Sequence, residues 1–231
     1  GTVRICALGG LNEVGKNMMF FEYVENGQKG PKAQGDIVIV DMGFQFPDAG
    51  MLGIDYIVPD ISYLLERKQN IRGILLTHGH LDHIGAIPYL IEKLGFPPIY
   101  GTRLTIGFVN KRLEEFGLTK SAKVHNIHPD DTLRLGHFTA SFFRVNHSIP
   151  DAVGVFLESP AGSFVHTGDF KFDMNPAGDQ RPAEFDKIAS YGNKNVLALF
   201  SDSTNALKPG QTISEQKVAN NLEAIIKKTE G

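Results

Sequence analysis

The sequence predicts a layered α/β sandwich, and three observations favour this fold class. Apolar runs of strand length recur along the chain, and stretches with helical spacing separate some of them. The residues best suited to chemistry stand directly after several of the apolar runs. In layered α/β domains the loops at strand ends converge into a site, so the fold class also predicts where those residues should meet.

The start of the chain is predicted to be rich in strands. Three apolar runs, at 3–8, 17–24 and 36–41, are expected to be strands, the first two paired. The polar segment 25–35 between the second and third is expected to be a hairpin loop. Cys6 is the single cysteine, and we expect it to be buried in the first strand as a small hydrophobic residue.

The middle of the chain is predicted to alternate between strands and helices. The short apolar run 71–76 is typical of a buried parallel strand, and residues 84–94 then have helical spacing. A short strand at 98–100 and an amphipathic helix at 102–116 follow. Turn residues then separate five further predicted strands, at 124–127, 132–135, 138–145, 153–158 and 163–167.

The last segment is predicted to begin a second domain. A buried type of strand at 195–200 is followed by a helix at 213–228, which has no later element to pack against. We therefore expect residues 1–211 to form one domain and residues 212–231 to begin a second domain, whose remainder is absent.

Composition limits the classes of function. The chain has 231 residues and a formal net charge of −3, which argues against a broad basic surface. Nucleic-acid binding would then depend on a local groove, on bound metals or on sequence outside this chain. No apolar run is long enough to cross a bilayer, and residues 1–4 open on a strand rather than on an export signal. With its lone cysteine, the chain is expected to be cytoplasmic and without a membrane partner.

The segment 77–83, Thr-His-Gly-His-Leu-Asp-His, predicts a dinuclear metal site on a strand-to-helix loop. His78 and His80 alternate in an extended stretch and should point the same way, whereas Asp82 and His83 lie at the turn into the helix and can reach a second ion. A purely structural role is a poor explanation for three histidines within six positions that are flanked by glycines rather than by a helical charge pattern. Both ions would still need further ligands.

Residues at two later strand ends can supply those ligands. His147 can complete a three-histidine shell and Asp169 can bridge the two ions. His166 lies one residue inside its strand and is expected to be a core residue or to support a ligand. The other histidines of this region show no pattern of partners and are expected at the surface: His125, His128 and His137.

Two further motifs precede the histidines. Asp41 ends a strand and can accept the outer N–H of a ligating histidine, although an aspartate that caps a turn is nearly as good an interpretation. Residues 10–17 match a phosphate-binding P-loop except that Asn17 replaces the hydroxyl residue that would hold magnesium. Because a strand-like run follows rather than a helix, we reject binding of a nucleoside triphosphate.

These residues carry a resemblance to a known family. The segment 77–83 resembles the metallo-β-lactamase superfamily, which includes lactonases, thioesterases and β-lactam hydrolases. More specific motifs resemble the β-CASP nucleases, and most of all the ribonuclease J family, over nearly the whole chain. These motifs lie at 9–18, 46–47, 53–55, 59–60, 146–151, 167–173 and 201–206.

The resemblance implies a fold and a set of roles. The fold would be an incomplete metallo-β-lactamase αββα sandwich followed by the start of a β-CASP domain. Asp202 matches the acidic residue of the first β-CASP motif, which in the family orients a histidine beyond the inserted domain. The chain ends before that domain is complete. One ion would be held by His78, His80 and His147 and the other by Asp82 and His83, with Asp169 bridging; the catalytic carboxylates would be Asp82, Asp169 and Asp202.

The resemblance also implies an activity. The substrate would be RNA, with 5′-monophosphorylated single strands preferred, cut endonucleolytically and from the 5′ end in RNA maturation and decay. The full-length protein would be a homo-oligomer. The ligands suit Zn²⁺, with Mn²⁺ as the alternative. Ser201, Ser203 and Asn205 are expected to contact substrate phosphate, although a plain strand-to-helix turn is an equal alternative. A structural Ca²⁺ is also implied near Gly53 and Asp55.

Two other functions remain open from the sequence. A small-molecule hydrolase on the same fold would not need the extension that begins at Thr212. An inactive RNA-binding or scaffold module would not need six metal ligands. Metal analysis separates the scaffold from an enzyme, because only an enzyme should hold two ions.

Overall fold

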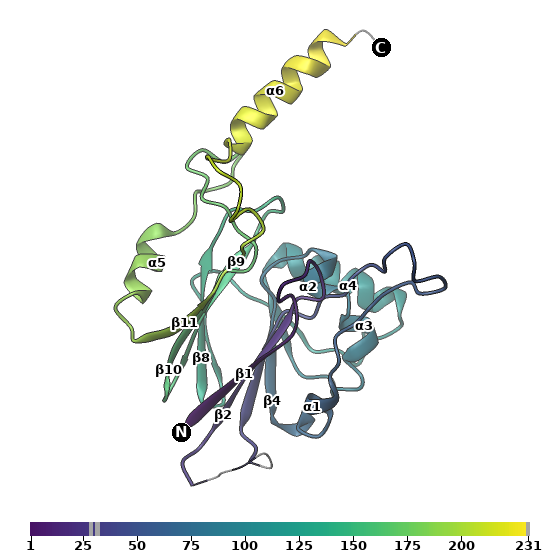
Figure 1. The fold of residues 1–231 in the computed structure, drawn as a ribbon, viewed down its shortest axis with the longest axis vertical. Helices are drawn as coiled ribbons and strands as arrows, with labels where there is room; N and C mark the ends of the chain where they lie inside the picture. Colours follow the sequence, from purple (N-terminus) through teal and green to yellow (C-terminus); the bar gives the residue numbers. More distant parts are fainter. Residues whose placement is uncertain (28–29, 31–32, 230–231) are drawn as a thin grey trace.

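A computed structural model describes residues 1–27, 30 and 33–229 of the chain. Two β-sheets face each other, and helices cover their outer faces (Figure 1). The predicted hairpin loop at 25–35 falls partly outside the described residues.

The first sheet has six strands in sequence order. Its first three strands are antiparallel and the remaining ones join in parallel. The strands are β1 (Thr2–Gly9), β2 (Met18–Val24), β3 (Asp36–Val40), β4 (Ile71–Leu75), β5 (Ile99–Gly101) and β6 (Val124–Asn126).

The second sheet has five strands, in the order β11-β10-β9-β8-β7. All neighbours are antiparallel except β10 and β11. The strands are β7 (Thr132–Leu135), β8 (Phe138–Arg144), β9 (Val153–Ser159), β10 (Gly162–His166) and β11 (Val196–Phe200).

Helices complete the four layers. The first sheet carries the short helices of the first half of the chain together with α4, and α5 (Phe185–Tyr191) lies on the outer side of the second sheet (Figure 1). The helices of the first sheet are α1 (Ser62–Leu65), the 3₁₀ helix η1 (Lys68–Asn70), α2 (Leu81–Ile84), α3 (Ile87–Leu90) and α4 (Arg103–Glu115). The predicted layered α/β sandwich is confirmed.

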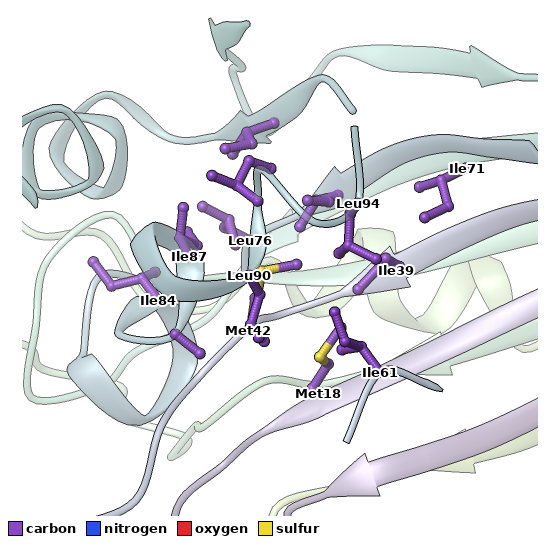
Figure 2. Close-up of a cluster of buried hydrophobic side chains, with 14 of the residues drawn as sticks. Met18, Ile39, Met42, Ile61, Ile71, Leu76, Ile84, Ile87, Leu90 and Leu94 are labelled. Atoms are coloured by element: carbon purple, nitrogen blue, oxygen red, sulfur yellow. The ribbon is translucent and has the colours of Figure 1, made fainter. Parts of the chain in front are cut away.

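Three buried clusters hold the layers together. One lies between the helices and the first sheet and includes Ile39, Leu76 and Leu90 (Figure 2). A second lies between the sheets, and the third lies under α5. Strand β2 contributes to two of them: Phe20 belongs to the first cluster and Phe21 to the second. Burial on both faces explains why its sequence is a continuous apolar run rather than an alternating one.

The helix predicted at 84–94 is wrong in two respects. It begins earlier, at Leu81, and it is interrupted, so that α2 and α3 are separate short helices. Pro88 accounts for the interruption, because it has no N–H to donate to the carbonyl of Ile84. Asp82 therefore lies in the first turn of α2 rather than before it.

The prediction that Cys6 is buried is also wrong, since its thiol is exposed. Strand β1 is the edge strand of its sheet, with β2 as its single neighbour, and this edge position leaves Cys6 uncovered. Helix α5 was not predicted, because only two of its residues, Ile188 and Tyr191, pack into the core.

Helix α6 (Glu215–Lys228) extends away from the sandwich (Figure 1). Its N-terminus is held by the segment that follows β10: Asp173 accepts a hydrogen bond from the backbone N–H of Glu215 at 2.8 Å, and Lys171 pairs with the Glu215 carboxylate. Farther along, α6 exposes the apolar side chains of Leu222, Ile225 and Ile226. No helix among the described residues is both long and apolar enough to span a bilayer.

Candidate metal centre

The candidate site lies where several strands of both sheets end. Asp41 follows β3, His78 and His80 follow β4, His147 follows β8 and Asp169 follows β10. Convergence of strand ends from two facing sheets brings together residues that are up to 128 positions apart, from Asp41 to Asp169.

Asp41 fixes the loop that carries the first two histidines. Its buried carboxylate accepts hydrogen bonds from the backbone N–H of Thr77 at 2.8 Å and from the Thr77 hydroxyl at 2.9 Å. The carbonyl of Thr77 in turn accepts from the N–H of Val153 at 2.9 Å, which ties this loop to the second sheet. The loop is thus held on both sides before any ligand binds.

Three imidazoles form the first group of possible ligands. His80 Nδ1 lies 3.1 Å from His78 Nε2 and 3.1 Å from His147 Nε2. Burial, with the nearby cationic His83, lowers the pKa of His78 to about 2, and burial also lowers the pKa of His147. Neutral imidazoles are the form that binds metals, so this group fits a divalent ion.

The second group of possible ligands consists of His83 and the carboxylates of Asp82 and Asp169 that face it. Its Nδ1 lies 2.8 Å from Asp41 Oδ2, which leaves Nε2 to face Asp169 Oδ1 at 3.4 Å and Asp82 Oδ2 at 3.5 Å. Burial by itself would lower the pKa of His83, but the carboxylates of Asp41 and Asp169 outweigh it and raise that pKa to about 10. A metal ion at Nε2 would take the place of that proton. The predicted contact between Asp41 and a histidine of the motif is present.

Asp169 faces both groups. Its Oδ1 is 3.4 Å from His83 Nε2, and its Oδ2 is 3.6 Å from His147 Nε2. The neighbouring histidines hold the pKa of its carboxyl group well below the usual range despite burial. An ionised carboxylate with one oxygen toward each group has the arrangement of a bridging ligand.

The geometry divides the ligands slightly differently from the sequence-based expectation. Among the residues that the structure describes, two sets have ligand atoms that all lie within 4.8 Å of one another: His78 with His80 and His147, and His78 with His83 and Asp169. His78 thus belongs to both sets. Asp82 belongs to neither set, although its Oδ2 lies 3.5 Å from Nε2 of His83, a member of the second set.

A cavity of about 580 Å³ opens beside the second group. Asp82, His83 and Asp169 line it together with the loop after β1 and the loop after β11. Ser201, Asp202 and Ser203 are part of its lining, whereas Asn205 is not. The expected substrate loop is therefore only partly at the cavity.

Asp202 lies at the cavity without belonging to either ligand set. Its backbone N–H donates to the Thr167 hydroxyl at 3.1 Å, and its Oδ1 accepts from the N–H and the hydroxyl of Thr204. These bonds make the loop after β11 a tight turn in which one carboxylate oxygen of Asp202 is occupied.

Other residues singled out in the sequence lie outside both ligand sets of the described residues. Asp55 is exposed in the loop before α1 and joins no ligand set of the described residues, so the calcium site stays a prediction. His125 and His128 are exposed as predicted. His166 lines the cavity and accepts from the N–H of Gly168 at 3.1 Å.

The expectation that His137 lies at the surface is only partly met, because its side chain is partly buried between two carboxylates. Its Nδ1 lies 2.6 Å from Asp36 Oδ2 and its Nε2 lies 2.9 Å from Glu25 Oε1. These partners are 101 and 112 positions away along the chain, so no local pattern could have indicated the contacts.

Asn17 is a polar residue of the site that the sequence interpretation did not place there. Its Nδ2 lies 3.2 Å from Asp82 Oδ2 and 3.1 Å from His83 Nε2. It belongs to the motif that resembles a P-loop, and β2 follows directly at Met18, as the rejection of that motif required. Two sequence signals involve Asn17: the mismatch at the final position of the P-loop-like motif and its place in the family-like motif 9–18.

Fold and site together define the class. Residues 53–188, more than half of the chain, match the family model described as "Beta-lactamase superfamily domain". The chain belongs to the β-lactamase superfamily, and its αββα sandwich with a His/Asp cluster at the strand ends is the metallo-β-lactamase fold that was expected.

Curated relatives narrow the resemblance further. The chain is similar to ribonuclease J of Thermus thermophilus, with 42% identity over 235 residues that cover 99% of this chain and 39% of that protein. It is similar to ribonuclease J2 of Bacillus subtilis, with 44% identity over 95% of this chain and 38% of that protein. The expected resemblance to the ribonuclease J family is confirmed, and the chain spans about two fifths of the length of these relatives.

Solved structures support the fold alone. A protein of unknown function from Enterococcus faecalis superposes with a TM-score of 0.68 at 17% identity. The match covers 97% of this chain and 57% of that one.

Proposed function

We propose that this chain is the metal-binding part of a ribonuclease that hydrolyses RNA phosphodiester bonds with two divalent ions. The observation that carries the proposal is the position of Asp169, whose two oxygens face His83 and His147 at 3.4 and 3.6 Å. A single carboxylate between two sets of imidazoles suits a pair of ions better than one ion.

Each residue then has a role. His78, His80 and His147 would hold one ion, and His83 would hold the other, with Asp169 facing both groups. Asp82, which lies in neither ligand set, would join His83 at the second ion. When bound, two divalent ions supply Lewis acidity and a water of lowered pKa, which suits cleavage of a phosphodiester. Asp41 keeps Nε2 of His83 directed at the site by bonding to its Nδ1.

The cavity provides a place for the substrate. It adjoins Asp82, His83 and Asp169 and is open to the turn that holds Ser201 and Ser203. Hydroxyl groups and backbone amides of that turn can donate to phosphate oxygens, as many protein contacts with nucleic acids do. RNA as the substrate is supported by the similarity to proteins named ribonuclease J.

Finer features remain part of the proposal. They comprise zinc or manganese as the resident metal, combined endonuclease and 5′-to-3′ exonuclease action on 5′-monophosphorylated RNA, and homo-oligomers of the full-length protein. They also comprise a β-CASP domain that begins near residue 212 and a histidine beyond that domain, which Asp202 would orient. A cytoplasmic location is a further part, and it suits a chain with one free cysteine.

The test combines metal analysis with cleavage. Elemental analysis of the chain at saturating metal should find two divalent ions, and a form extended to the length of its relatives should cleave RNA in a metal-dependent manner. Substrates with 5′-monophosphate and 5′-triphosphate ends, compared at equal metal concentration, test the end preference. RNA left intact by a two-metal extended protein that hydrolyses small esters or lactams would favour the small-molecule hydrolase instead.

A further inference from the structure

The main chain of Asn17 is fixed between two segments of the site. Its N–H donates to the carbonyl of Asp82 at 3.0 Å, and its carbonyl accepts from the N–H of Gly43 at 2.9 Å. Gly43 is itself pressed against α2, since a Cβ there would lie 1.5 Å from the Asp82 carbonyl oxygen. These contacts do not depend on the side chain at position 17, so replacing that side chain leaves them in place.

The side chain of Asn17 adds a contact of a different kind. Its Nδ2 lies 3.2 Å from Oδ2 of Asp82. Asp82 stands on a helix of four residues and its side chain is about one-third exposed, so little packing restrains its rotamer. Within the described part of the chain, Asn17 supplies the one hydrogen-bond donor other than His83 that approaches this carboxylate.

The hydrogen-bonding capacity of Asp82 decides which atom of the Asn17 amide faces it. An ionised Asp82 has acceptors only, so the nitrogen of the amide must face it and the oxygen must point away. The oxygen lies beside Gly10, at a position where the backbone φ of +82° and a Cβ only 2.4 Å from Asn17 Oδ1 both favour glycine. Nδ2 also lies 3.1 Å from His83 Nε2. This nitrogen carries a proton in the cationic, metal-free imidazole and would carry the metal ion in the loaded site, so it accepts no hydrogen bond in either state and the bond to Asp82 carries the argument.

We infer that Asn17 is a positioning residue for the second metal ion: its amide holds Oδ2 of Asp82 so that the carboxylate is fixed as a ligand beside His83. The inference rests on the proposed function, because it takes Asp82 and His83 to hold an ion. It also explains the mismatch in the P-loop-like motif, since a serine at this position would be too short to reach Asp82 in the same way.

The experiment measures metal binding rather than activity. Wild type, Asn17→Leu, Asn17→Ser and, as a control in the same loop, Asn12→Gly are prepared metal-free and titrated with Zn²⁺ and with Co²⁺ to saturation. Asn12 has a φ of 58°, which glycine tolerates, and it is exposed. Unfolding temperatures of the metal-free variants are measured alongside.

We expect both Asn17 variants to bind the second ion about tenfold more weakly and the first ion normally, as is typical when the partner of a metal ligand is removed. The Co²⁺ absorption bands of the second ion should change, whereas the unfolding temperature of the metal-free chain should barely move. Asn12→Gly should match wild type in every measurement.

Two results would overturn the inference while leaving the proposed function intact. One is normal binding of both ions by the Asn17 variants. The other is equal weakening of both ions together with a lower unfolding temperature, which would indicate a role in folding alone. A wild-type chain that binds one ion or none at saturation would instead overturn the dinuclear proposal itself, and the inference with it.

Discussion

Nδ1 of His83 and Oδ2 of Asp41 lie 2.8 Å apart, and both side chains are almost fully buried. Such a pair stabilises the cationic imidazole when no metal is present, and it directs Nε2 at the site when a metal is bound. The same contact therefore has opposite consequences for the pH dependence of stability in the two states.

The metal-free chain should be most stable near pH 6.5. The pKa of His83 is raised to about 10, so its contribution is complete below pH 6.5 and is lost as the pH rises toward 10. The pKa of His78 is lowered to about 2, so its contribution is complete above pH 6.5 and is lost as the pH falls. Thermal unfolding in a chelator from pH 4 to 10 measures this, with Asp41→Asn expected to flatten the alkaline limb.

Bound zinc should reverse the loss of stability of the chain as the pH rises. Ligands must lose their protons to bind a metal, so the affinity for zinc increases with pH. With saturating Zn²⁺ the unfolding temperature should increase between pH 6 and 8, where the metal-free chain weakens. Parallel curves with and without zinc would contradict the assignment of His83 as a ligand.

Replacing His78 or His80 by alanine should remove at least one metal ion. His78 lies in both ligand sets, so His78→Ala is expected to reduce binding of both ions, whereas His80→Ala should affect the three-histidine set alone. Elemental analysis after dialysis gives the stoichiometry. His128→Ala, at an exposed site away from the centre, is the matched control, and unchanged metal content in the His78 variant would defeat the assignment.

Asp169→Asn keeps the size of the side chain but removes the negative charge that faces both sets. In a form extended to the length of the relatives, this variant should lose RNA hydrolysis almost completely. Its unfolding temperature in chelator should fall by a smaller amount, because the cationic His83 loses one of its two facing carboxylates. Cleavage rates under single-turnover conditions are the measurement. Near-normal cleavage by this variant is incompatible with a bridging carboxylate.

The 231-residue chain alone should degrade RNA poorly. It spans about two fifths of its ribonuclease J relatives, and its net charge of −3 offers few phosphate contacts. We expect the ion near Asp82 and His83 to bind weakly in this form. Assay of this chain and an extended one on the same 5′-monophosphorylated RNA tests the point, and equal turnover would mean that the present site is self-sufficient.

Two glycines should respond oppositely to alanine. Gly43→Ala forces a methyl group onto the Asp82 carbonyl and should destabilise the chain by about 1–3 kcal/mol while weakening metal binding. Gly107 lies within α4, and a methyl group added there would meet no other atom within 4 Å, so Gly107→Ala should stabilise the chain by about 0.5–1 kcal/mol. Denaturant unfolding of both variants gives the comparison.

The sequence predicts which residues of the site stand at strand ends, because an apolar run followed by His or Asp is a local pattern. His78, His147 and Asp169 were placed correctly at strand ends for that reason. The contact of Asn17 with Asp82 joins residues 65 positions apart and has no local signature, so it could not be predicted. The exposure of Cys6 was likewise missed, because which strand lies at an edge depends on the order of the whole sheet.

Hydrogen bonds join the N-terminus of helix α6 to two loops of the candidate metal centre. Asp173, which accepts a hydrogen bond from the backbone N–H of Glu215 at the start of the helix, follows shortly after Asp169. Lys171, between these two aspartates, donates its backbone N–H to the carbonyl of Asn146, the neighbour of His147. The helix has 14 residues and is about 21 Å long, at about 1.5 Å per residue. The N-terminus of α6 is therefore joined by hydrogen bonds to the loops that carry Asp169 and His147, and we expect any partner that restrains this helix to restrain both loops as well.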